Sequence, residues 1–325
     1  MTPLLEVEDL RITFPTRHGT SHPVDGVSFS VARGELLALV GESGCGKSLT
    51  SLALLRLVPP PGQIQPGSAI RLDGTDVLGL GPEELRSIRG RRIGMIFQDP
   101  MTSLNPVFTI ADQIGESVRA HQKVSKRAAR ARALELLQEV GIPDPTQRLD
   151  VYPHQMSGGM RQRVMIAIAL ASEPEMLIAD EPTTALDVTV QAQILELLDG
   201  LRAARGMAVL LITHDLGIVA GRADRVAVMY AGRLVEEAAT AELFARPSHP
   251  YTKGLLASVP RITGAVTRLT PIAGTVPAPT AWPAGCRFHP RCPAALPRCA
   301  TDDPPALPVG NAHRMRCWLA EAGRA

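Results

Sequence analysis

The stretch GESGCGKS, residues 41–48, decides the fold of this chain. It fits the pattern G-x-x-x-x-G-K-[ST], in which glycines let backbone N–H groups surround a polyphosphate without Cβ clashes. A continuous apolar run, ELLALV, precedes it at residues 35–40, and KSLTSLALLRLV follows at residues 47–58 with helical apolar spacing. The pattern therefore predicts a buried strand, a phosphate-binding loop and a helix in direct succession.

The chemistry of this loop depends on its last residues. Lys47 is expected to reach the β and γ phosphates of a nucleoside triphosphate, and the Ser48 hydroxyl to ligate Mg²⁺. Cys45 is interpreted as a small residue of the loop. The residues of this segment expected to bind the nucleotide are Gly41, Ser43, Gly44, Cys45, Gly46, Lys47, Ser48 and Leu49.

A second motif, MLIADE at residues 176–181, reads as an apolar strand that ends in two carboxylates. Ligands gather at the carboxyl ends of parallel strands. We expect Asp180 to hold Mg²⁺, directly or through water, and Glu181 to polarise the water that attacks the phosphate. An acidic pair after a strand is by itself weak evidence for a catalytic site. We assign it these roles because the same chain carries a phosphate-binding loop.

The remaining chain alternates strands and helices. Residues 5–14 and 24–31 read as N-terminal strands with alternating apolar residues, and residues 110–140 read as two helices. Short apolar runs that read as further strands lie at residues 93–97, 176–179, 208–213 and 226–230. Strands that alternate with helices predict an α/β fold with a parallel core sheet.

Composition excludes several classes of protein. The chain has 325 residues, 45% of them hydrophobic, and its 34 basic and 32 acidic residues leave a net charge of +2. Such a balance is typical of a globular protein and gives no indication of nucleic-acid binding. The longest apolar run, residues 164–171, is too short to cross a bilayer, and the start MTPLLEVEDL lacks a signal-peptide pattern. We therefore expect the chain to stay in the cytoplasm.

Four further motifs, in order, make the chain resemble the ATP-binding cassette (ABC) family. MSGGM at residues 156–160 resembles the family's signature LSGGQ, with Met156 and Met160 at the two positions that differ. Gln98 follows the strand IGMIF as in the Q-loop, and Ala185-Leu186-Asp187 resembles the D-loop. His214 follows AVLLIT at the position of the switch histidine.

The resemblance implies roles for particular residues. Catalysis is assigned to Glu181, His214, Gln98 and Lys47, and Gln98 joins Ser48 and Asp180 as an Mg²⁺ ligand. Ser157 of one subunit is expected to face the γ-phosphate bound by another, so that two subunits complete each site. Nucleotide contacts outside the loop are expected from Phe14, which stacks the adenine, and from Gln98, Ser157, Gly158, Gly159, Asp180 and Asp187.

Other stretches resemble one branch of the family, the ATPase subunits of bacterial oligopeptide and dipeptide importers. They are QDPMTSLNP at residues 98–106, MSGGMRQRVMIAIAL at 156–170, HPYTKGLLASVP at 249–260 and GCRFHPRCP at 285–293. The resemblance implies peptide import driven by ATP hydrolysis at the cytoplasmic face of the membrane. The implied partners are a second ATPase subunit, which is a paralogue, two transmembrane permease subunits and an external solute-binding protein.

The last forty residues contain a cysteine cluster with the spacing C-x5-C-x6-C-x17-C. Thirteen prolines between residues 247 and 308 predict little regular structure, so we expect metal ligation to organise this tail. The wide, irregular spacing suits iron–sulfur better than zinc, which remains an alternative together with free or disulfide-linked thiols. The family resemblance implies a [4Fe-4S] cluster on Cys286, Cys292, Cys299 and Cys317.

The expected architecture has two parts. Residues 1–250 form an ABC ATPase domain with a parallel core sheet, an antiparallel β-subdomain and a helical subdomain at about residues 100–165. Residues 251–325 form a Cys-rich C-terminal extension. The same ATPase role in an importer of nickel or another small solute is the alternative function.

Three other functions fit less well. A chromosome-organising ATPase needs a long coiled coil between the Q-loop and the signature, but 58 residues separate Gln98 from Ser157 and show no sustained heptads. A translation-factor ATPase carries two cassettes, and this chain has one phosphate loop. A binding module without turnover lacks the catalytic carboxylate, which here is Glu181.

Overall fold

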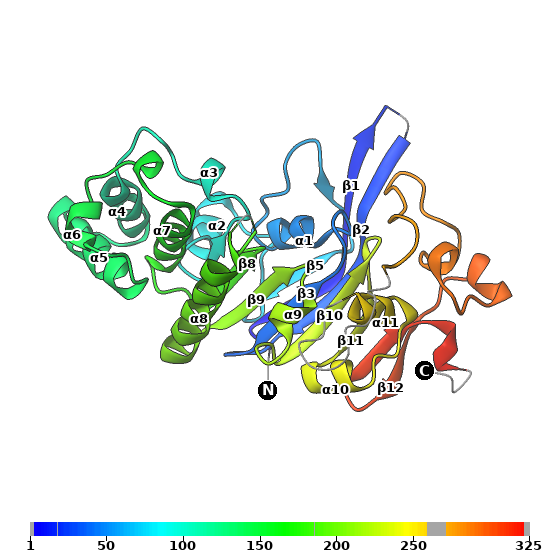
Figure 1. Cartoon of the computed structure of the whole chain (residues 1–325). Coiled ribbons are helices and arrows are strands. Elements are labelled where there is room, and N and C mark those ends of the chain that lie inside the picture. The colour runs from blue at the N-terminus through cyan, green and yellow to red at the C-terminus, as the bar shows by residue number, and fades with distance from the viewer. Residues whose placement is uncertain (1–2, 18, 185, 259–270, 322–325) are drawn as a thin grey trace. The chain divides into compact units, whose positions relative to one another are not determined.

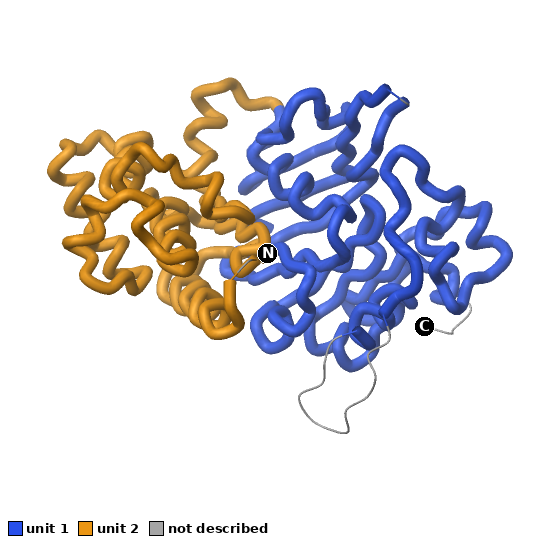
Figure 2. Tube along the Cα trace, turned by 45° about the horizontal axis from the view of Figure 1, so that its top comes forward, with its two compact units in different colours: residues 1–78, 212–325 blue, residues 79–211 orange. Residues whose placement is uncertain are grey.

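The computed structural model describes residues 3–17, 19–184, 186–258 and 271–321. Figure 1 shows its helices and strands. The chain divides into two compact units, and Figure 2 distinguishes them by colour. One unit combines residues 1–78 with 212–325, and the other contains residues 79–211. The first unit is therefore assembled from the two ends of the sequence.

An antiparallel sheet opens the first unit (Figure 1). Its strands follow the order β2-β1-β5-β6, with β4 paired to β1. Alternation buries Val7, Leu10 and Ile12 of the first strand, as period-two spacing predicts. The strands are β1 (Leu5–Thr16), β2 (Gly19–Val31), β4 (Gln63–Ile64), β5 (Ala69–Leu72) and β6 (Thr75–Asp76).

A second set of strands in this unit follows the order β12-β13-β11-β10-β3. Strand β3 (Leu36–Val40) is buried at every residue and pairs in parallel with β10 (Arg225–Tyr230). Two-sided burial explains its continuous apolar sequence. The other elements of this set and its helices are β11 (Arg233–Ala239), β12 (Ala306–Gly310), β13 (His313–Arg316), α1 (Lys47–Leu54), α9 (Leu216–Val219), α10 (Thr240–Ala245) and α11 (Pro250–Ala257).

The C-terminal tail has more order than its proline content suggests. Strand β13 pairs with β11 and β12, and three short 3-10 turns complete the segment. Met315, Cys317 and Leu319 form a small core, against which Leu296 and Val309 pack. The expectation of little regular structure in this tail is therefore wrong, because strand pairing and apolar burial order it. The turns are η2 (His289–Arg291), η3 (Pro297–Ala300) and η4 (Trp318–Ala320).

The second unit contains strands β7 (Ile93–Ile96) and β8 (Met176–Asp180), which pair in parallel. Strand β9 (Ala208–Thr213) neighbours β8 and crosses the boundary at which the unit ends. The helical elements of the second unit are α2 (Pro82–Ile88), α3 (Pro100–Ser103), α4 (Ile110–His121), α5 (Lys126–Glu139), α6 (Pro145–Arg148), η1 (Pro153–Gln155), α7 (Gly158–Leu170) and α8 (Val188–Arg205).

The structure confirms most of the predicted elements. The strands expected at residues 93–97, 176–179, 208–213 and 226–230 are present within one residue of their bounds, and residues 110–140 form two helices. The helix expected over residues 47–58 ends early, at Leu54, because Arg56 adopts a left-handed conformation with φ 52° before the proline run. Among the described residues, every helix is too short or too polar to span a bilayer.

Candidate functional site

The loop GESGCGKS lies in the first unit between β3 and α1. A Cβ atom on Gly41 would lie 2.2 Å from the carbonyl oxygen of Met229, and one on Gly46 would lie 2.5 Å from that of Pro23. Both positions therefore accept glycine alone without movement of the backbone. Gly46 has φ 109° and immediately precedes α1. The first N–H groups of a helix have no intrahelical partner, so this loop offers backbone donors to an anion.

Lys47 is buried in the loop, with 4% of its surface exposed. Its ammonium donates to the carbonyl oxygens of Gly41 at 2.7 Å and of Glu42 at 3.0 Å. The carbonyl groups of the loop therefore stabilise the positive charge of the buried Lys47 ammonium. Its remaining contact is with the Cys45 sulfur at 3.8 Å, a weak acceptor that a phosphate oxygen can replace.

Glu42 has contacts that its position in the motif does not indicate. Its backbone N–H donates to the Tyr251 hydroxyl at 2.9 Å. Its two carboxylate oxygens accept from the Arg291 guanidinium at 2.7 and 3.0 Å. Sequence reasoning missed both partners, because they lie 209 and 249 residues further along the chain.

His214, the expected switch histidine, is exposed at the end of β9 and belongs to the first unit. The residues around it are fixed by local hydrogen bonds. The hydroxyl of Thr213 accepts from the Asp215 N–H at 3.0 Å, and the Asp215 carboxylate caps α9 by accepting from the Gly217 N–H at 2.7 Å. His214 therefore projects from an ordered turn.

Glu181 and Gln98 meet in the second unit. The Gln98 side-chain amide donates to a Glu181 carboxylate oxygen at 3.0 Å, and the Thr184 hydroxyl donates to the same oxygen at 2.9 Å. Glu181 also has φ 46°, a left-handed conformation that is uncommon for a residue with a side chain. Such strain is characteristic of functional sites, where the surrounding structure maintains it. Thr184 is the member of this group that sequence reasoning missed.

Asp180 ends β8 with 5% of its surface exposed. Its carboxylate therefore lies at the carboxyl end of a parallel strand, as the sequence predicts. Carboxylate, hydroxyl and amide oxygens, the donor types of Asp180, Ser48 and Gln98, are the ligands that Mg²⁺ prefers. Ser48 belongs to the first unit and Asp180 and Gln98 to the second, and each side chain by itself offers an oxygen that suits Mg²⁺.

The signature-like segment begins α7 in the second unit. The Ser157 side chain caps the helix by accepting from the Met160 N–H at 3.3 Å. A Cβ atom on Gly159 would lie 2.7 Å from the Val190 side chain, so this glycine allows a close approach to α8. Asp187 caps α8 by accepting from the Val190 N–H at 2.9 Å. Ala185, the first residue of the expected D-loop, lies outside the described residues.

Phe14, the expected adenine-stacking residue, is half-buried in β1. Its ring packs against the turn that follows the proline run: a Cβ atom on Gly62 would lie 2.5 Å from the ring. This contact accounts for part of its burial. Adenine stacking by Phe14 stays a prediction.

The four tail cysteines do not form a metal-binding group. Among the described residues, no set of three or more His, Cys, Asp or Glu side chains is placed to hold a metal ion. Burial raises the pKa of the Cys286 thiol to about 11. The predicted cluster on Cys286, Cys292, Cys299 and Cys317, with iron or with zinc, therefore has no support in the structure.

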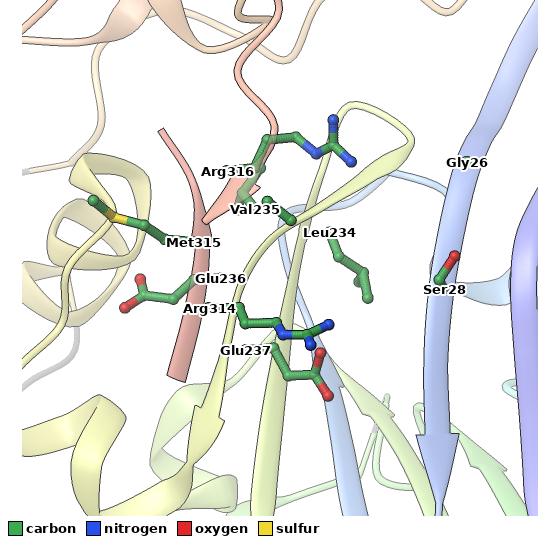
Figure 3. Close-up of a pocket in the computed structure, with 10 residues that line it drawn as sticks. Gly26, Ser28, Leu234, Val235, Glu236, Glu237, Arg314, Met315 and Arg316 are labelled. Atoms are coloured by element: carbon green, nitrogen blue, oxygen red, sulfur yellow. The ribbon is translucent and has the colours of Figure 1, made fainter. Parts of the chain in front are cut away.

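A cavity of about 180 Å³ lies in the first unit, away from the predicted nucleotide residues. Strands β2, β11 and β13 contribute most of its wall, and Figure 3 shows the Glu237 and Arg314 side chains next to each other there. Burial raises the pKa of Glu237. None of the residues singled out in the sequence lines this cavity, which lies next to the paired strands of the tail.

Comparison with known families agrees with these motifs. The family described as "ABC transporter" matches residues 24–184, and the family described as "Oligopeptide/dipeptide transporter, C-terminal region" matches residues 235–299. Among solved structures, a dimeric post-hydrolysis state of the ATP-binding cassette MJ0796, bound to ADP and Pi, has a TM-score of 0.65 at 28% identity. That similarity covers 73% of this chain and 98% of the other.

Curated relatives match over nearly the whole chain. The dipeptide transport ATP-binding protein DppD of Bacillus subtilis is 51% identical over 321 residues, which are 99% of this chain and 96% of the relative. A putative peptide import ATP-binding protein of Brucella abortus is 52% identical over 96% of this chain and 94% of its own length. The chain thus belongs to the ABC transporter family, within the group of dipeptide and oligopeptide transport ATP-binding proteins.

Proposed function

We propose that this chain is the ATP-binding and ATP-hydrolysing subunit of an importer that takes up dipeptides and oligopeptides. The observation that carries this proposal is the match to peptide-transport ATP-binding proteins over the tail as well as the cassette. The cassette motifs alone are common to the whole ABC family. The match over the tail favours the group of peptide transporters within that family.

In the proposed reaction, Ser48, Gln98 and Asp180 would hold Mg²⁺, which would offset part of the charge of the triphosphate. The backbone of residues 41–48 and the Lys47 ammonium hold the phosphates. Glu181, fixed by Gln98 and Thr184, orients and polarises the attacking water. His214 contributes a further polar group at the γ-phosphate. Ser157 and Asp187 act on the nucleotide of a partner subunit, so that catalysis requires two cassettes.

The partners follow from the same proposal. A second ATPase subunit, two transmembrane permease subunits and an external solute-binding protein complete the importer. The chain itself binds at the cytoplasmic face of the membrane. We further propose the division into an ATPase domain, residues 1–250, and a Cys-rich extension, residues 251–325, with the helical subdomain at about 100–165.

Purification of the intact complex tests this function. The chain should co-purify with two membrane proteins and a second cassette, and peptide together with the solute-binding protein should stimulate ATP hydrolysis in reconstituted vesicles. Stimulation by Ni²⁺ instead would assign the complex to a metal importer. A chain that purifies without membrane subunits from its own cells would contradict the proposal.

The [4Fe-4S] cluster is a separate proposal, on which the ATPase function does not depend. It rests on the sequence resemblance and requires the four cysteines to rearrange around a cluster. Iron analysis of anaerobically purified protein decides it. About four irons per chain, with broad absorption near 400 nm, would support the cluster, and iron-free protein would exclude it.

A further inference from the structure

Glu42 is held at three points, all within the first unit. Arg291 binds both oxygens of its carboxylate, the Tyr251 hydroxyl accepts from its N–H, and its carbonyl oxygen accepts from Lys47 at 3.0 Å. The residue belongs to the phosphate loop, whereas Arg291 belongs to the turn η2 and Tyr251 to helix α11. The C-terminal part of the chain therefore contacts the phosphate loop directly.

Arg291 is rigidly placed for this contact. Its side chain is 5% exposed, and its Nε donates to the carbonyl oxygen of Ala273 at 2.8 Å. The guanidinium carbon lies 5.7 Å from the centre of the Tyr230 ring, within reach of a cation–π interaction. The bond to Glu42 raises the pKa of Arg291, so the guanidinium keeps its charge. Two parallel N–H···O bonds to the two oxygens of a carboxylate are the geometry in which arginine binds this group most strongly.

Tyr251 is equally fixed. Its side chain is fully buried, and its ring lies 4.6 Å from that of Tyr230 and 5.4 Å from that of Phe288, measured between centroids. The hydroxyl therefore has one position, at which it accepts from the Glu42 N–H. Tyr251 fixes the backbone of the loop while Arg291 fixes the side chain.

The pairing has an electrostatic consequence for nucleotide binding. Glu42 places a negative charge inside a loop built to receive a triphosphate, and an unpaired carboxylate there repels the ligand. We propose that Arg291 is a positioning residue for ATP: it neutralises Glu42 and holds it away from the phosphates, so that the C-terminal tail sets nucleotide affinity. This inference rests on the proposed ATPase function.

Nucleotide titration of the full-length chain tests the proposal with Arg291→Ala, Arg291→Lys and the double variant Arg291→Ala with Glu42→Gln. Arg298→Ala is the matched control, because this tail arginine pairs with Glu321 rather than with the loop. The dissociation constants of MgATP and MgADP are measured for each variant, and circular dichroism verifies folding. If Arg291→Ala does not fold, Arg291→Lys, which keeps the charge, is compared with Arg291→Gln.

Arg291→Ala should weaken ATP binding about tenfold and ADP binding by less, because repulsion grows with phosphate charge. Arg291→Lys should retain most of the affinity, and adding Glu42→Gln to Arg291→Ala should restore it to within about threefold of the parent. Equal affinities for Arg291→Ala and the Arg298→Ala control would overturn the proposal. So would a loss that Glu42→Gln does not rescue, since that indicates a purely structural role.

The parent protein separates this inference from the function on which it rests. A parent chain that binds no ATP contradicts the ATPase function itself. A parent that binds ATP while all Arg291 variants bind it equally well contradicts the role of Arg291 alone.

Discussion

Glu181 is fixed on two sides at a strained backbone position. Gln98 and Thr184 both donate to one oxygen of its carboxylate. A general base must be held within hydrogen-bond reach of the water that it activates. The left-handed backbone of Glu181 helps to aim the side chain, and its cost is met by the surrounding structure.

Glu181→Gln should therefore bind ATP and lose turnover. The amide keeps the size of the side chain but cannot accept a proton from water, so the steady-state rate should fall by at least about a hundredfold. ATPase assays and nucleotide titration of the same preparation measure the two effects. Glu196→Gln, an exposed change on α8, is the control. A rate within about twofold of the parent would show that Glu181 is not the base.

Lys47→Ala should lose binding and hydrolysis together. The ammonium interacts with phosphate oxygens in the ground state and with the charge that develops as the γ-phosphoryl group leaves. We expect the dissociation constant for ATP to rise at least about tenfold and hydrolysis to become undetectable. Lys123→Ala, on an exposed turn, provides the comparison. Unchanged affinity and rate would refute the assignment.

The motif residues could be predicted from sequence because their chemistry depends on short spacings. Lys47 and Ser48 follow glycines at fixed distances, and Asp180 and Glu181 end an apolar run. The partners of Glu42 could not be predicted in this way. Arg291 adjoins Cys292 in GCRFHPRCP, and the cysteines of this stretch led the interpretation toward metal binding.

At the scale of elements, the hairpin β12–β13 joins the tail to the rest of the first unit, because β13 pairs with β11. Strand β12 lies at the end of the strand order, where Pro308 is tolerated because an edge strand needs fewer donors. Proline content alone therefore led to the wrong expectation of little regular structure. The alternation in residues 313–319, where the structure buries Met315, Cys317 and Leu319, did not enter that expectation.

Met315→Ala should loosen this hairpin. The side chain is 1% exposed in the small tail core, and removing such a buried group costs about 2–5 kcal/mol. We expect the tail to become more sensitive to limited proteolysis than it is in the parent protein. Asn311→Ala, an exposed change in the turn between β12 and β13, should leave protease resistance unchanged. Equal protease resistance in the two variants would contradict this account of the tail.

At the scale of the whole chain, acid should destabilise the protein through His249. Burial lowers the pKa of this histidine from 6.5 to about 3. The unfolded chain therefore binds a proton below pH 6.5 that the folded chain excludes, and stability falls as the pH drops from 6.5 toward 3. Its backbone N–H and that of Ser248 donate to Glu236, which also accepts from His313, and Lys253 adds further positive charge nearby.

His249→Asn should remove this part of the pH dependence. Asparagine can still cap α11, as His249 does through the Tyr251 N–H. At pH 5 the histidine costs about 2 kcal/mol of folding free energy relative to pH 8, so the shift in urea midpoint between these pH values should be smaller in the variant. His154→Asn, an exposed change, should behave like the parent. The same shift in all three proteins would show that His249 is not responsible.

The sequence predicted the α/β class because β3, β8 and β9 are continuous apolar runs between helical segments. It did not predict that the first compact unit joins the two ends of the chain. Strand β3 pairs with β10, and no local pattern near residue 40 indicates a partner near residue 225. Pairing between such distant strands depends on packing that only the complete fold provides.

That discontinuous unit has a consequence for protein synthesis. Glu42 precedes Arg291 by 249 residues, so at about 5–20 residues per second the ribosome adds Arg291 roughly 12–50 s after Glu42. Throughout that interval the phosphate loop exists without its arginine, and the intervening unit, residues 79–211, emerges first. The proposed role of Arg291 therefore implies that the nascent chain acquires full nucleotide affinity only after residue 291 has been added.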